Sequence, residues 1–218
     1  VESRGLGDVY KRQYMHSLIF HSSKFTFLLL ATISFPVLLE TEMILQLWLE
    51  TVPNYTAVFV RLMLCTTIID AMAGAFMVSA QATGAVRVYQ SVVGGILLTI
   101  VPVSYIVLKM GAEPWSVFIV HLCVCILAFA VRLFILCRMI HLSLSGYFTK
   151  VLLRCMGVLI IALPLPLILL YFLSDTFINS IMVCLSGLLA MLFSSYVIGL
   201  VSNERKFIKD KILLFLKL

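Results

Sequence analysis

Long, uninterrupted apolar stretches dominate the chain, and short polar segments separate them. An α-helix needs roughly 20 apolar residues to cross a bilayer core of about 30 Å. Six stretches meet this requirement, so the pattern predicts six membrane-spanning helices. Transmembrane β-strands instead alternate apolar and polar residues, which these stretches do not. The predicted spans are 25–48, 55–80, 89–108, 115–140, 152–172 and 177–200.

Short segments with turn-forming residues connect the predicted spans. Proline, glycine, asparagine and serine recur in them, and these residues favour turns over helix interiors. The segments are 52–54, 83–84, 111–114, 143–146 and 174–175. Because such short connections make successive helices antiparallel neighbours, the sequence predicts an all-α fold, a polytopic transmembrane helix bundle.

Composition excludes a soluble fold. Hydrophobic residues make up 62% of the chain and charged residues 12%, compared with about 45–50% and about 25% in soluble domains. A domain of 218 residues has too little interior to bury so much apolar surface. The mean hydropathy of +1.13 supports the same interpretation. Membrane lipid is therefore the first expected partner.

The basic residues are distributed unevenly between the two ends of the predicted spans. With the N-terminus placed in the cytoplasm, Lys109 alone flanks the outer ends, while ten of the 16 basic residues flank the inner ends. Cytoplasmic loops are enriched in Lys and Arg. Both chain ends are therefore expected in the cytoplasm, and the protein in the cell inner (plasma) membrane. This topology explains the net charge of +6 without a nucleic-acid partner. The inner basic residues are Lys24, Arg87, Arg138, Lys150, Arg154, Arg205, Lys206, Lys209, Lys211 and Lys217.

The two ends of the chain differ from the apolar region between them. Residues 1–13 are polar and have neither a start methionine nor an apolar signal segment, so they are interpreted as a non-native leader, and the chain as a fragment. Residues 14–202 form the predicted six-helix bundle. Residues 203–218 mix lysines with large apolar residues, which is typical of a basic amphipathic helix on the cytoplasmic membrane surface.

Asp70 is the most informative ionisable residue, because it falls near the middle of the second predicted span. Ionisable groups in spans are costly, and they usually face the bundle interior or a water-filled cavity. At helical spacing Gly74, Met77 and Gln81 share its face, which gives a partly polar stripe towards the cytoplasmic end. Two interpretations remain open: a cavity wall in which Asp70 binds a proton or cation, and a structural Asp paired with a neighbouring helix.

Two arginines and a glutamate also lie within predicted spans. Arg61 precedes Asp70 by nine residues and so points to nearly the opposite side of the helix. Arg61 and Arg132 either extend to the membrane surface or contact a substrate. Glu40 shares a helix face with Pro36, a predicted kink. It either lines a pore or lies in water just beyond the end of the helix.

No catalytic or cofactor-binding motif occurs in the chain. It contains no P-loop, no nucleophile elbow and no helical His/Glu metal motif, and its four histidines are scattered. Its six cysteines lie in or beside apolar stretches, where free thiols act as small hydrophobic groups. The sequence therefore predicts a protein that is not an enzyme and has no cofactor and no metal site.

Several runs of residues follow the pattern of a transporter family. They are 24–27 (KFTF), 35–42 (FPVLLETE), 44–49 (ILQLWL), 52–55 (VPNY), 59–62 (FVRL), 81–90 (QATGAVRVYQ) and 102–105 (PVSY). In spacing and hydropathy, residues from about 14 to 203 resemble the second half of a lipopolysaccharide or O-antigen flippase. These flippases belong to the multidrug/oligosaccharidyl-lipid/polysaccharide exporter superfamily.

The resemblance implies two helix bundles with a substrate cavity between them. Alternating access would move undecaprenyl-diphosphate-linked oligosaccharide, a lipid-linked oligosaccharide, across the inner membrane. Because the chain has helices for only one bundle, the missing N-terminal half of the same protein is a further expected partner. The family's cavity is cationic, so arginines are candidates for binding the diphosphate or an acidic sugar. The cavity candidates are Arg61, Arg87, Arg132, Gln81 and Glu40, and the candidate for ion coupling is Asp70.

Two other functions remain open. A cation-coupled multidrug antiporter half from the same superfamily would rely more on Asp70 than on the arginines. A complete six-helix membrane protein would instead act as a scaffold or regulator of a partner complex.

Overall fold

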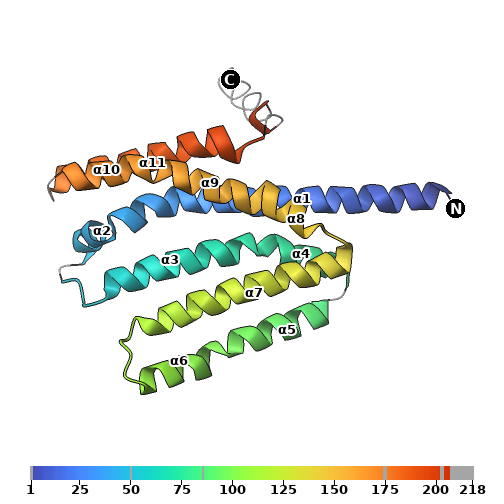
Figure 1. Ribbon diagram of the computed structural model, residues 1–218, viewed down its shortest axis with the longest axis horizontal. Coiled ribbons are helices and arrows are strands. Elements are labelled where there is room, and N and C mark those ends of the chain that lie inside the picture. The colour runs from blue at the N-terminus through green and yellow to red at the C-terminus, as the bar shows by residue number, and fades with distance from the viewer. Residues whose placement is uncertain (1, 50, 85, 174–175, 202–203, 207–218) are drawn as a thin grey trace.

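The chain folds into helices that lie side by side (Figure 1). The computed structural model describes residues 2–49, 51–84, 86–173, 176–201 and 204–206, with side chains from residue 13 onward. These residues contain helices and no strand, which confirms the all-α fold class. The elements, with η for π-helical turns, are α1 (Glu2–Leu39), α2 (Thr41–Trp48), α3 (Thr56–Met72), α4 (Gly74–Ala82), α5 (Val86–Leu98), α6 (Ile100–Lys109), α7 (Ser116–Ile140), α8 (Leu144–Tyr147), η1 (Phe148–Leu152), α9 (Leu153–Ala162), α10 (Pro164–Phe172), α11 (Phe177–Ser194) and η2 (Ser195–Gly199).

Six helical segments of the described chain are long and apolar enough to cross a membrane. The predicted polytopic membrane fold is therefore confirmed. The fifth segment begins at Leu144, earlier than the predicted residue 152, because α8 and η1 continue the helix through the polar residues that precede it. The segments are Gln13–Leu39, Thr56–Ala82, Val86–Lys109, Ser116–Ile140, Leu144–Phe172 and Phe177–Gly199.

The first span lies earlier in the chain than the sequence pattern indicated. It covers Gln13–Leu39 instead of 25–48, because the backbone bends at Glu40 and α2 begins after it. Lys24 was expected to flank this span, but it lies inside α1 and its residue is only 3% exposed. The span accommodates this lysine because Glu204 pairs with it.

Prolines mark two of the helix breaks. Thr99 separates α5 from α6, three residues before Pro102, and Leu163 separates α9 from α10, directly before Pro164. Proline has no N–H and cannot bond to the carbonyl four residues earlier. The missing N–H groups therefore explain why helical hydrogen bonding is interrupted in these two spans.

Helix α1 lies in the middle of a row of helices (Figure 1). Helix α3 packs on one side of α1, and α11 packs on the other. Farther out, α7 packs against α3, α5 and α6 pack against α7, and α9 and α10 pack against α11. Because the helices form a row, many of their large apolar side chains are exposed, as in a surface that meets lipid or further protein.

An aromatic cluster fastens α8 to the row. The buried Tyr147 packs edge-on against Phe20 of α1 and Phe76 of α4, with ring centroids 5.8 and 5.4 Å apart. Phe129 of α7 lies 5.3 Å from Phe76. Such aromatic pairs contribute about 0.5–1.5 kcal/mol each beyond their buried area. The cluster therefore holds four helices together at one place.

Candidate functional site

A carboxylate and a guanidinium meet within the membrane-spanning region. Asp70 is the fifteenth residue of the 27-residue span Thr56–Ala82. Its Oδ1 accepts a hydrogen bond of 2.8 Å from Nη1 of Arg132 on the neighbouring α7. The Asp70 side chain is 46% exposed and the Arg132 side chain 15%. Asp70 is thus paired with a neighbouring helix and still open on one side.

The backbone changes conformation directly after Asp70. The amide of Ala73 donates to the carbonyl of Asp70 at 3.1 Å, a tighter turn than that of an α-helix, and α4 begins at the next residue. This break leaves the carbonyl of Met72 without a helical N–H partner. The buried hydroxyl of Ser23 on α1 donates to that carbonyl at 2.9 Å. Tight turns inside long helices often mark hinges, and this one lies beside the ion pair.

The residues predicted to share a face with Asp70 are exposed. Gly74, Met77 and Gln81 all lie at the surface, between mid-span and the end of α4. Arg87 follows near the start of α5 and is also exposed. The side chains of Gln81 and Arg87 make no hydrogen bond or ion pair with other described residues. Both remain available to a ligand or to another protein segment.

Two uncharged polar side chains lie beside the ion pair. Tyr89 on α5 is 3% exposed and interacts electrostatically with both Asp70 and Arg132. Its buried hydroxyl has no hydrogen-bond partner among the described residues. Cys125 on α7 is 1% exposed, and its thiol donates to the carbonyl of Thr66, one helical turn before Asp70, at 3.9 Å. Neither residue could be identified from the sequence, because a tyrosine or cysteine within an apolar stretch has no distinguishing pattern.

Asp70 and Arg132 both keep unused hydrogen-bonding capacity in their ion pair. An ionised carboxylate has about four acceptor sites and a guanidinium five donors, so one shared hydrogen bond leaves both groups able to bind more. The exposed side of Asp70 can take up a proton or a cation. The N–H groups of Arg132 that remain free can bind an anionic oxygen. Because a charged side chain facing lipid is costly, this face is suited to border water or another protein segment.

Arg61 and Glu40 lie apart from this ion pair, where α1 gives way to α2. The Arg61 Nε donates to Thr41 Oγ1 at 3.2 Å, and Nη2 lies 3.6 Å from Oε1 of Glu42. Glu40 is half-buried at the bend after Leu39. The structure therefore joins two of the six predicted site residues, Asp70 and Arg132, by a direct contact.

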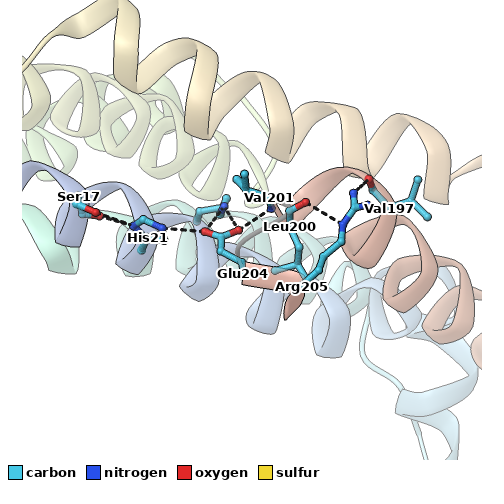
Figure 2. Close-up of polar contacts among 8 residues, drawn as sticks. Ser17, His21, Val197, Leu200, Val201, Glu204 and Arg205 are labelled. Atoms are coloured by element: carbon cyan, nitrogen blue, oxygen red, sulfur yellow. Dashed lines mark hydrogen bonds and ion pairs between the residues drawn. The ribbon is translucent and has the colours of Figure 1, made fainter. Parts of the chain in front are cut away.

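A second ion pair is buried where α1 meets the chain after η2. Lys24 Nζ donates to both carboxylate oxygens of Glu204, at 2.7 and 2.6 Å. Figure 2 shows His21 reaching from α1 towards Glu204, with its Nε2 3.0 Å from Oε1. The amide of Val201 donates to Oε2 at 2.8 Å. This ion pair was not predicted from the sequence. The only available signal was that His21 and Lys24 are three residues apart and share a helix face.

The predicted ends of the chain are described only in part. Residues 204–206 belong to the predicted tail, and the rest of that prediction lies outside the described residues. Arg205 donates to the carbonyls of Leu200 and Val197, which lie at the end of η2 (Figure 2). Basic side chains often satisfy the last carbonyls of a helix in this way. The backbone of residues 2–12 belongs to α1, and their interpretation as a non-native leader stays a prediction.

Metal-ligating and redox groups are dispersed in the structure. Over the described ranges, no three His, Cys, Asp or Glu side chains are grouped so that they could hold a metal ion. All six cysteines are free thiols.

No protein-family model, curated protein or solved structure matches the chain. Membership of the flippase family therefore stays a prediction from the sequence.

Proposed function

We propose that the chain forms one lobe of a membrane transporter that flips undecaprenyl-diphosphate-linked oligosaccharide across the inner membrane by alternating access. The surface with Asp70, Gly74, Met77 and Gln81 faces the translocation path. Arg132 contributes donors for an anionic substrate group, and Asp70 couples movement to a proton or cation.

One observation supports this proposal most directly: a carboxylate near mid-span is paired with an arginine and is still 46% exposed. A purely structural ion pair is best placed between helices and out of contact with lipid, because exposure to lipid is costly. An ion pair on a path that alternately holds water and substrate needs an open side. Exposed residues continue from Asp70 through Gly74 and Met77 to the polar Gln81, which lies towards one end of the span.

The test replaces each charge in the full-length protein in its host cell. Asp70→Asn and Arg132→Gln each remove one charge with little change in size. Since a hydrogen bond to a charged group is worth about 1.5–3 kcal/mol, each variant should lower surface polysaccharide roughly tenfold or more. Lipid-linked oligosaccharide should accumulate at the same time. Lys109→Gln, an exposed lysine at the end of α6, is the matched control and should leave both quantities unchanged.

Immunoblots of membrane fractions separate lost transport from lost protein. Normal surface polysaccharide in both variants, at normal protein abundance, would refute the proposal. Loss of cation-linked drug efflux in Asp70→Asn, with surface polysaccharide unchanged, would instead identify the antiporter function.

A further inference from the structure

A cavity of about 560 Å³ opens at the end of the bundle where α1 passes the first part of the fifth span and the chain just after the sixth span. One wall is a stripe of α1 that contains His16, Phe20 and His21. The opposite wall contains Lys150 of η1 and Arg154 of α9. Ligand sites typically occupy about 300–1,000 Å³. The cavity is therefore large enough for a small polar group such as a lipid headgroup.

The cavity has an excess of positive charge. Lys24 and Glu204 also line it, and they neutralise each other through their short, buried contacts. Lys150 and Arg154 have no such compensation, because neither forms an ion pair with a described carboxylate. Two uncompensated cations therefore remain on one wall.

The two cations lie about one helical turn apart and line the same wall of the cavity. Lys150 and Arg154 are four residues apart along the helix, and like charges at that spacing repel each other. Lys150 lies over the ring of Phe20, with Nζ 5.9 Å from the ring centroid. It belongs to the π-helical turn Phe148–Leu152, and such turns occur often at functional sites. A bound anion would remove the repulsion between the two cations.

We propose that this cavity binds a phosphate group through Lys150 and Arg154, with His16 and His21 on the facing wall. Two sources carry this chemistry at a membrane surface: the headgroup of an anionic phospholipid and a soluble phosphate compound. Basic pockets between transmembrane helices at the membrane surface are suited to anionic headgroups. The proposal does not depend on the transport function, because the cavity residues are separate from Asp70 and Arg132.

The cavity's position supports a ligand from the membrane surface. Its lining comes from the first half of the spans Gln13–Leu39 and Leu144–Phe172 and from the chain just beyond the end of Phe177–Gly199. The headgroup region of a bilayer borders the ends of membrane-spanning helices, so this end of the bundle is where lipid phosphate groups would meet the protein. The cavity can therefore be reached by a lipid headgroup from the side and by a soluble phosphate from the water.

The experiment measures phosphate binding by the full-length protein in nanodiscs. One arm purifies the wild-type protein and the Lys150→Gln and Arg154→Gln variants from mixed nanodiscs. Quantitative lipid analysis then compares the amount of phosphatidylglycerol that each protein retains. The other arm titrates inorganic pyrophosphate onto protein in phosphatidylcholine nanodiscs and follows the melting temperature. Arg138→Gln is the matched control, because Arg138 has the same charge, is exposed in the last turn of α7 and does not line the cavity.

Each cavity variant should weaken binding roughly tenfold or more in at least one arm, since each removes a charge-assisted contact. Loss of phosphatidylglycerol alone identifies a lipid ligand, and loss of the pyrophosphate effect alone identifies a soluble one. Either result supports the site when Arg138→Gln binds normally. Absence of binding in both arms, or an equal loss in Arg138→Gln, overturns the proposal. If the variants and the wild-type protein have equal melting temperatures in phosphatidylcholine without pyrophosphate, the variants are folded. With two cavity variants, the test still works if one of them does not fold.

Discussion

At the scale of single residues, the buried contact between Lys24 and Glu204 joins parts of the chain that are 180 residues apart. The two residues are 3% and 9% exposed. In such a place, removing one partner leaves the other charge buried and unpaired, which typically costs about 3–5 kcal/mol. The pair therefore ties the chain after η2 to α1.

Lys24→Met and Glu204→Gln should each lower the stability of the protein by about 3–5 kcal/mol. The double variant Lys24→Met/Glu204→Leu should regain most of this loss, because it leaves no buried charge. Thermal denaturation of the purified protein in detergent provides the measurement. Lys109→Met, at an exposed position, is the control. If the double variant were less stable than both single variants, the ion pair would be favourable in itself and this explanation would fail.

The Asp70–Arg132 and Lys24–Glu204 ion pairs differ in how much of each could be predicted from the sequence. Asp70 was identifiable because a carboxylate in the middle of an apolar stretch demands an explanation. Its contact with Arg132 was not, because the rotation of α7 against α3 depends on packing that a single sequence does not reveal. Lys24 was assigned to a flank because lysines usually lie outside spans. The position of Lys24 inside α1 is favourable only because Glu204 pairs with it, and no local sequence pattern connects the two residues.

At the scale of elements, two glycines of the last span allow it to approach α1. A Cβ at Gly187 would lie 3.0 Å from Leu39 Cδ1 and 3.5 Å from Phe35 Cδ1. A Cβ at Gly199 would lie 2.9 Å from Leu28 Cδ1. Small residues at helix contacts permit this approach in membranes, where packing is a main source of helix association.

Gly187→Leu should therefore separate α11 from α1 and destabilise the protein by about 1–3 kcal/mol, the usual cost of overpacking. Gly95→Leu, on α5, makes the same change where a Cβ would meet nothing within 4 Å. It should leave the melting temperature unchanged or slightly raised. Equal destabilisation by both substitutions would show that close packing at Gly187 is not the cause.

The spans themselves were predictable from the sequence, because a helix that crosses lipid must be long, apolar and internally hydrogen-bonded. The breaks near Pro102 and Pro164 followed from the missing N–H of proline. The bounds of the first span were not predictable from hydropathy. The apolar run continues past Glu40 into α2, whereas the mixed polar and apolar residues before Lys24 belong to helix α1. Hydropathy detects apolar stretches, but it does not locate a bend inside one.

At the scale of the whole molecule, the row of helices leaves the face with Asp70 uncovered by the described chain. Helix α3 lies between α1 and α7, and Asp70, Gly74 and Met77 are exposed along it and α4. Apolar residues elsewhere are exposed as well, such as Leu98 at 72%, and these suit contact with lipid. Exposure alone does not distinguish the two surfaces. Contact with water does, and the transport proposal requires water on the Asp70 face.

The most direct measurement is therefore the labelling of single cysteines by a charged, membrane-impermeant thiol reagent. It uses the full-length protein in native membranes with its native cysteines replaced, including the six of this chain. Gly74→Cys and Met77→Cys test the Asp70 face. Leu98→Cys, in the middle of the span Val86–Lys109, is the exposed apolar control. We predict rapid labelling at Gly74 and Met77 and none at Leu98. Labelling at all three positions after detergent is added, but at none of them in the membrane, would place the Asp70 face in lipid or against protein and contradict a translocation path there.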